Sequence, residues 1–151
     1  MQELKDLFLK LARVGAPLGF EEPMMKVFRS ELEPYVDEVH QTPRGNVVGT
    51  KKGSDPEAPS VALIAHMDQI GFIVFSIDER GFIRFRKLGG PVSRAIQGQQ
   101  MRILTKKGTI TGVVGLKPGH ITRPEEEATI PPIEEMYIDI GSRSRDEATA
   151  M

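Results

Sequence analysis

The sequence predicts an α/β fold in which the α/β part is interrupted by a small all-β unit. Three observations predict it: apolar residues at helical spacing near the N-terminus, one short apolar run typical of a covered strand, and two hairpin patterns in the middle of the chain. We expect the α/β part at residues 1–69 plus 135–151 and the all-β unit at residues 70–134.

Two helices are expected at the N-terminus. The first covers residues 2–14, and a second begins near Glu21 with Pro23 in its first turn, where a missing N–H costs nothing. The apolar face of the first helix comprises Leu4, Leu7, Phe8, Leu11 and Val14. The buried stripe of the second is predicted to comprise Met25, Phe28 and Leu32.

Short strands are expected next. Residues 36–42 and 46–51 flank a plausible Pro-Arg-Gly turn, which indicates a hairpin. Residues 61–65 form a continuous apolar run behind a loop of Gly, Asp and Pro. Such a run is typical of a central strand covered on both faces, as in a parallel sheet.

The middle of the chain reads as β structure. Residues 70–77 and 81–87 surround one turn, and residues 101–105 and 109–114 surround another. No helical period occurs between 70 and 116, so we expect a small all-β unit such as a barrel.

The last third of the chain changes character again. Residues 117–134 hold four prolines and an acidic run, which predict a mobile loop. Residues 136–141 are expected to form a strand that returns to the first part. The pattern from Ser144 to Glu147 matches a capping box that opens a helix.

Charge and composition exclude several classes of protein. Twenty basic residues face 21 acidic ones, so nothing favours nucleic acid or an anionic membrane as a partner. The chain has no cysteine, which excludes disulfides and thiolate metal sites. The N-terminus does not resemble a signal peptide, and no apolar stretch approaches the roughly 20 residues that span a bilayer. We expect a cytoplasmic protein.

His66 and Asp68 are the residues most suited to chemistry. They follow the apolar run, and residues i and i+2 of an extended segment point to the same side. Ligands of open α/β sheets bind at such strand ends, and a metal-binding histidine usually donates its other N–H to a carboxylate. Spacing alone leaves a second interpretation open, a solvated polar strand end, because an isolated His-x-Asp is a weak signal. His40 is expected on the protein surface, and His120 is expected in the Pro-rich loop.

Motifs of other enzyme classes are missing from the sequence. There is no Gly-x-Ser-x-Gly of a serine hydrolase, no phosphate-binding loop and no dinucleotide pattern. The acids offer no paired-carboxylate signal of a glycosidase.

Several longer strings carry a resemblance to a known family. The strings AHMDQIGFIV, GFIRFRKLGG and GQQMRILTKKGTITGVVGLKPGH resemble the TET-type aminopeptidases, co-catalytic metallopeptidases that include glutamyl and deblocking aminopeptidases and are sometimes labelled endoglucanases. The agreement continues at residues 19–22, 44–47 and 131–141, in order and with matching spacing. It covers essentially the whole chain.

The resemblance implies a function and a site. A peptidase α/β domain (1–69 plus 135–151) would be interrupted by a PDZ-like dimerisation domain (70–134). His66 matches the first metal-ligand histidine, and Asp68 matches the catalytic aspartate that supports it. Family members use two divalent metal ions, zinc or cobalt, to release N-terminal residues from peptides, and they form homo-oligomers built from dimers. Their other ligands and their general-base glutamate lie beyond the part that this chain matches.

The sequence departs from the family pattern at one position, and one alternative function is open. The family commonly has glutamate where this chain has Gln69, which removes a negative charge beside the site. The alternative is a truncated or split paralogue that acts as a non-catalytic oligomerisation module, with His66 and Asp68 as relics.

Overall fold

The computed structural model describes residues 1–115, 117, 119–127 and 129–151. It forms two compact units, Met1–Gln69 and Ile70–Met151. Their boundary coincides with the change from helical to alternating pattern near residue 70. The two units are described separately below.

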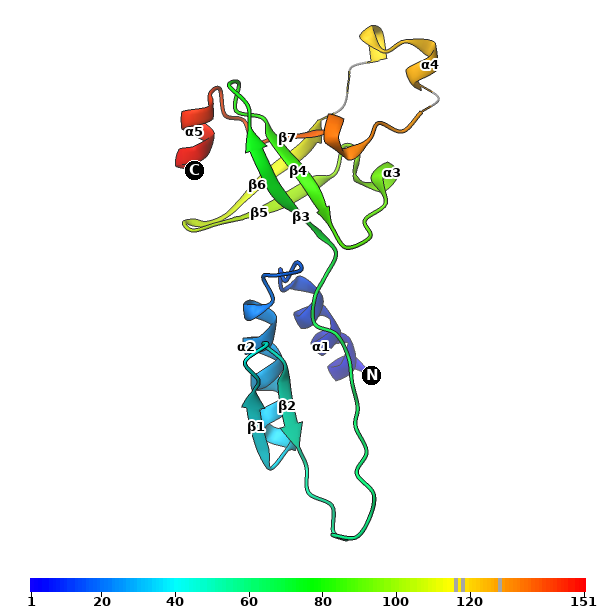
Figure 1. Cartoon of the computed structure of the whole chain (residues 1–151), viewed down its shortest axis with the longest axis vertical. Coiled ribbons are helices and arrows are strands. Elements are labelled where there is room, and N and C mark those ends of the chain that lie inside the picture. The colour runs from blue at the N-terminus through cyan, green and yellow to red at the C-terminus, as the bar shows by residue number, and fades with distance from the viewer. Residues whose placement is uncertain (116, 118, 128) are drawn as a thin grey trace. The chain divides into compact units, whose positions relative to one another are not determined.

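The first unit contains both expected helices and the expected hairpin (Figure 1). Its elements are α1 (Gln2–Arg13), α2 (Glu22–Leu32), the 3₁₀ helix η1 (Glu33–Tyr35), β1 (Glu38–Gln41) and β2 (Val47–Thr50). Strands β1 and β2 pair antiparallel. Pro23 lies in the first turn of α2, as predicted.

Packing in the first unit is light. Met24 is the buried residue of α2, and the predicted Met25, Phe28 and Leu32 are half-buried. Helix α2 approaches β2 closely at Gly49, where an added Cβ would lie 2.6 Å from the Leu32 side chain. Glycine is therefore required at that contact.

The prediction of a central strand at residues 61–65 is wrong for this structure. Every residue from 1 to 69 is described, and none pairs with this segment. Val61, Leu63 and Ile64 are 85%, 96% and 91% exposed. A central strand needs a hydrogen-bonded neighbour on each side, and the first unit supplies neither.

The second unit is built around one antiparallel sheet, which curls in Figure 1. Its strands are β3 (Gly71–Ile77), β4 (Ile83–Leu88), β5 (Gln100–Thr105), β6 (Gly108–Gly115) and β7 (Tyr137–Asp139), in the order β3-β4-β7-β6-β5. The short helices are α3 (Ser93–Ile96), η2 (Gly119–Ile121), α4 (Pro124–Glu127), η3 (Ile133–Glu135) and α5 (Arg145–Ala150). Both predicted hairpins are confirmed, β3 with β4 and β5 with β6.

The core of the second unit lies on one face of this sheet. Its buried members are Ile83, Phe85, Ile96, Val114, Ile133, Met136 and Ile138. Phe72 meets Phe85 edge-on, with ring centroids 5.1 Å apart. The alternation of Ile83 and Phe85 along β4 is what turns both side chains inward.

Strand β7 has partners that the sequence does not predict. The expected strand forms, but it lies between β4 and β6, with Ile138 opposite both Ile83 and Val114. The buried Ile138 explains this position, since Gly112 leaves the space in which its side chain packs. The division into a peptidase part (1–69 plus 135–151) and an inserted part (70–134) stays a prediction.

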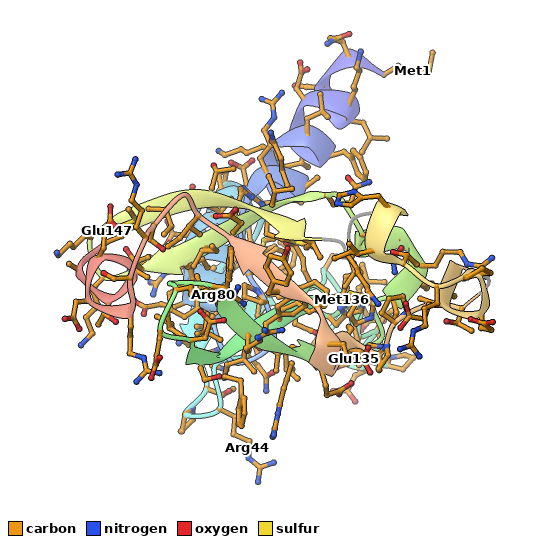
Figure 2. The ribbon with its side chains drawn as sticks, turned by 90° about the horizontal axis from the view of Figure 1, so that it is seen from above. Met1, Arg44, Arg80, Glu135, Met136 and Glu147 are labelled. Carbon is orange, nitrogen blue, oxygen red and sulfur yellow. The ribbon has the colours of Figure 1, made fainter. Side chains whose placement is uncertain are left out.

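The predicted capping box opens α5. The Ser144 hydroxyl accepts a hydrogen bond from the Glu147 N–H at 3.2 Å, and the Glu147 carboxylate accepts one from the Arg143 N–H at 2.8 Å. Glu147 lies on this short helix in Figure 2. The Arg145 guanidinium donates to the Ile77 carbonyl at 2.9 Å, which ties α5 to β3.

The Pro-rich segment contains short helical turns held by Glu126. Its carboxylate accepts hydrogen bonds from the Arg123 N–H and from the Lys117 ammonium. These two donors, the N–H first, hold the pKa of Glu126 below its usual value. Mobility of residues 119–130 stays a prediction, and residues 118 and 128 lie outside the described residues.

Replacing Ile138 tests the placement of β7. We expect Ile138→Ala to lower the free energy of unfolding by about 2–5 kcal/mol, because the change leaves a cavity between β4 and β6. Val113→Ala, at an exposed position of β6, should change it by less than about 0.5 kcal/mol. Urea unfolding measures both, and equal effects would contradict the buried position of Ile138.

The Pro-rich segment should respond to acid. Because the folded-state pKa of Glu126 is lowered, its contacts stabilise the segment above the ordinary glutamate pKa and are lost as pH falls through the lowered value. Nitrogen-15 relaxation should show residues 119–130 as more mobile than β4, increasingly so in acid. Glu126→Gln should abolish the pH dependence, whereas Glu125→Gln should retain it. A rigid segment at every pH would refute the expectation.

Candidate functional site

His66 and Asp68 contact one another. The His66 Nδ1 lies 3.2 Å from the Asp68 Oδ1 and 3.1 Å from the Asp68 carbonyl oxygen. Both neighbours are acceptors, so Nδ1 is the nitrogen that carries the proton in neutral imidazole. The lone pair is then on Nε2, and the side chain is 85% exposed, so this nitrogen is accessible to a ligand. The predicted contact between the two residues is present.

A backbone contact positions this pair. The Gln69 N–H donates to the Ala16 carbonyl at 2.8 Å, and Gln69 forms a parallel bridge with Pro17. Ala16 is fully buried, which makes it a firm attachment point. The segment that carries His66 is thereby tied to the loop that precedes α2.

That loop also holds Glu21 in place. Gly19 adopts a φ of +83°, a left-handed conformation that favours glycine, and its N–H donates to the Glu21 carboxylate at 2.7 Å. The Phe20 N–H closes the turn onto the Pro17 carbonyl at 2.8 Å. The acid at the start of α2 is thus fixed by local backbone geometry.

A pocket of about 290 Å³ lies beside the pair. It is lined by Glu21, Met25, Arg44, Gly45, Asn46, Ala65, His66, Met67 and Asp68. Three segments of the first unit therefore meet here: the start of α2, the β1–β2 turn and the segment around His66. The exposed Arg44 side chain extends from that turn (Figure 2). Such a volume is near the lower end of the range for ligand pockets.

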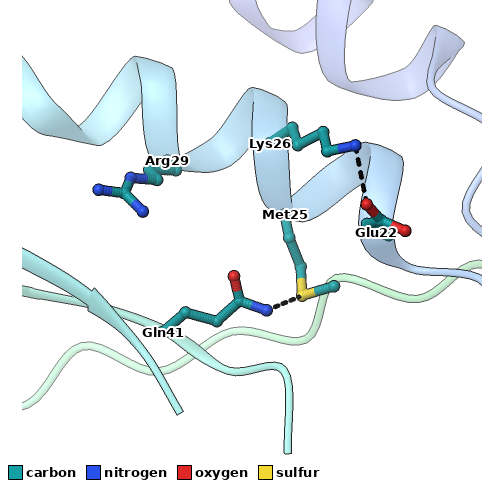
Figure 3. A pocket seen from close by; sticks show the side chains of 5 residues that line it. All are labelled: Glu22, Met25, Lys26, Arg29 and Gln41. Carbon is teal, nitrogen blue, oxygen red and sulfur yellow. Dashed lines mark hydrogen bonds and ion pairs between the residues drawn. The ribbon is translucent and has the colours of Figure 1, made fainter. Parts of the chain in front are cut away.

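A second hollow of about 460 Å³ lies between α2 and β1 (Figure 3). It is lined by Glu22, Met25, Lys26, Arg29 and Gln41. Its cations already have partners, since Lys26 pairs with Glu22 at 2.8 Å and Arg29 pairs with Glu33 at 3.0 Å. The hydrogen bond from Lys26 lowers the pKa of Glu22. Without a histidine, this hollow is the weaker candidate for a metal site.

The side chains near the pocket include groups that could bind a metal ion. Within residues 1–115, 117, 119–127 and 129–151, no group of three or more His, Asp or Glu side chains is placed to hold a metal ion. His40 lies on β1 and His120 in η2. Among these described residues, His66 beside Asp68 is the histidine with a carboxylate partner.

Comparison with known proteins decides the family. Residues 45–151 match the sequence pattern of the M42 glutamyl aminopeptidases. The chain belongs to the M42 glutamyl aminopeptidase family. The resemblance to TET-type aminopeptidases drawn from the sequence is confirmed.

Relatives in this family are considerably longer. The chain is 37% identical over 121 residues to the lysyl aminopeptidase of Pyrococcus furiosus, covering 80% of this chain and 34% of that protein. A solved TET aminopeptidase from Thaumarchaeota archaeon SCGC AB-539-E09 superposes with a TM-score of 0.90 at 35% identity, over 99% of this chain and 42% of that one. The TET1 peptidase of Pyrococcus horikoshii, which can assemble into a tetrahedron or a large octahedral shell, gives a TM-score of 0.83 at 28% identity, over 97% and 43%. This member of the family thus spans about two fifths of the solved chains.

Sequence reasoning missed part of the pocket. It singled out His66 and Asp68 for chemistry, whereas Glu21, Arg44 and Asn46 entered only as parts of a helix start, a turn or the strings that carried the resemblance. No spacing rule connects these three residues to His66, because they come from separate segments. The sequence feature that could have pointed to them is the position of polar residues at a helix start and in a hairpin turn.

The imidazole of His66 should show a tautomer preference. In alkaline solution we expect its proton on Nδ1 more often than that of His40, because both neighbours of Nδ1 at His66 are acceptors. Asp68→Ala should reduce the preference, since only the backbone acceptor is kept. Nitrogen-15 shifts of the ring measure it, and identical tautomer populations at His66 and His40 would show that the contact does not form in solution.

Proposed function

We propose that this chain supplies the first metal-ligand histidine of a metal-dependent aminopeptidase that releases N-terminal residues from peptides. The observation that carries the proposal is the His66–Asp68 contact, which leaves Nε2 accessible beside a pocket in a member of the M42 glutamyl aminopeptidase family. His66 acts as the ligand, and Asp68 acts as the residue that orients it.

The chemistry follows from the two roles. His66 would hold one of two divalent ions, such as zinc or cobalt, which would supply polarisation of the scissile carbonyl and a more acidic water. Asp68 holds the His66 ring in one tautomer. The pocket, with Glu21 on its wall, receives the N-terminal residue of the peptide. Gln69 keeps the backbone bridge to Pro17 and adds no charge there.

The remainder of the site is proposed to lie outside these residues. The chain spans about two fifths of the solved chains it matches, so further carboxylates, a second histidine and the general base would come from the rest of a complete protein. We propose a cytoplasmic homo-oligomer with peptides as substrates and with neither nucleic acid nor membrane as partner. Among the described residues, no helix is both long and apolar enough to cross a bilayer.

A second candidate function is a non-catalytic oligomerisation module. The described residues favour it in one respect, since they bring no three metal-binding side chains together. In this case the second unit would mediate assembly, and His66 and Asp68 would be relics. The two candidates differ in whether His66 binds metal in preference to other histidines.

Cobalt titration separates the two candidates. We expect Co²⁺ to broaden the NMR signals of residues 65–69 first, with weak affinity, because one imidazole leaves most coordination positions to water. His66→Gln should remove the effect, and the matched variant His40→Gln should leave it unchanged. Aminoacyl-nitroanilides should not be hydrolysed by this chain.

Two results would contradict the proposal in different ways. Broadening that is equal at His66, His40 and His120 would favour the non-catalytic module. Tight binding of two metals per chain with turnover would show that the ligand set is complete within these 151 residues.

A further inference from the structure

We propose that Arg44 is a specificity-determining residue, which binds a carboxylate on the residue that follows the N-terminal residue of a peptide. The inference rests on the aminopeptidase function proposed above and concerns the same pocket beside His66. The substrates that it favours are short peptides whose second residue carries a free carboxylate. That carboxylate is either the chain terminus of a dipeptide or an acidic side chain.

Arg44 is a cation of the pocket wall without an acidic partner. It lines the pocket of about 290 Å³, and in the described part of the chain it forms no ion pair. The cations of the neighbouring hollow differ, because Lys26 pairs with Glu22 and Arg29 pairs with Glu33. A guanidinium presents its donors in a planar fork that matches a carboxylate. Arg44 is therefore available to an anion from outside the chain.

The turn between β1 and β2 presents Arg44 on an ordered backbone. The Thr42 N–H donates to the Asn46 carbonyl at 2.9 Å, and the Gly45 N–H donates to the Thr42 carbonyl at 2.9 Å. The Thr42 hydroxyl also accepts from the Asn46 N–H at 3.1 Å. Gly45 adopts a φ of +88°, a conformation that favours glycine. Because the backbone is already ordered, ligand binding at Arg44 costs mainly side-chain entropy.

The same pocket holds an acid in a fixed position. The Glu21 carboxylate accepts the Gly19 N–H at 2.7 Å, and among the described residues it forms no ion pair, with Arg44 or with any other cation. The free amine at the start of a peptide is an ammonium group that such a carboxylate attracts. The pocket thus offers one anion and one cation, which complement a peptide with a free amine and a free carboxylate.

Met25 sets the spacing between the two charges. It lies one helical turn after Glu21, about 6 Å along the axis of α2. It also supports the turn that carries Arg44, since an added Cβ at Gly45 would lie 3.3 Å from the Met25 sulfur. An extended peptide spans at most about 3.3–3.6 Å per residue, so this spacing corresponds to about two residues. A peptide with its amine at Glu21 therefore brings its second residue toward Arg44.

Peptide titrations followed by NMR test this assignment on the whole 151-residue chain without metal. Ala-Ala supplies a terminal carboxylate, Ala-Glu-amide supplies a side-chain carboxylate, and Ala-Ala-amide supplies neither. We expect at least one of the first two to shift the signals of residues 44–46 and of the Arg44 Nε–H. Ala-Ala-amide should bind about three- to tenfold more weakly than that peptide, because an exposed charge-assisted contact is lost. The tighter of the two acids identifies the source of the carboxylate.

Variants separate carboxylate recognition from a structural role. Arg44→Gln should make the free acids and the amide bind alike, whereas the matched variant Arg29→Gln should keep the difference between them. Arg44→Lys should keep part of the difference, since it retains the charge and loses the planar fork. A merely structural role of Arg44 would weaken all three peptides equally and leave their ratio unchanged, which would overturn the assignment. Circular dichroism checks that each variant folds.

Three further results would contradict the assignment, and they differ in what else they reach. If both acids bind the parent chain no more tightly than Ala-Ala-amide, no carboxylate is recognised, although the pocket still receives peptides. If the acids keep their advantage in Arg44→Gln, another cation binds the carboxylate. If no peptide shifts residues 21 or 44–46, the proposed role of the pocket is wrong as well. The cobalt result at His66 is measured without peptide and stands separately.

Discussion

The hydrogen bond from the Gln69 N–H to the Ala16 carbonyl, 2.8 Å long, is the constraint on which the candidate site depends. Within the described part of the chain, residues 61–65 pair with no strand, and this bond with the bridge to Pro17 joins the His66 segment to the loop before α2. The same loop fixes Glu21 through Gly19. One side of the pocket is therefore assembled around a short stretch of backbone, and a change in its conformation would separate Glu21 from His66.

Features that depend on residues close together in the sequence could be predicted, and features that depend on residues far apart could not. Helices α1, α2 and α5, the hairpins and the capping box at Ser144 were predicted because their patterns are local. The contact between His66 and Asp68 followed from i, i+2 geometry for the same reason. The partners of β7 and the state of residues 61–65 depend on which distant strands are present, and local patterns do not contain that information. The role of Arg44 in the pocket is likewise non-local.

Residues 61–65 and strand β3 both expose apolar side chains, but they differ in how their backbones are held. Val61, Leu63 and Ile64 project from a chain segment without strand pairing, so burying them requires new partners for backbone and side chains alike. Strand β3 is already hydrogen-bonded on one side and packs Phe72 against a closed core. Strand β3 is therefore held by pairing and packing within its unit, whereas residues 61–65 have neither.

The His66–Asp68 pair and strand β3 rest on separate groups of contacts in this chain. The ring orientation of His66 depends on Asp68 and on the Ala16–Gln69 bond, all within residues 1–69. The geometry of β3 depends on β4, on the Phe72–Phe85 contact and on Arg86, all within residues 70–151. A change confined to one set removes no contact of the other.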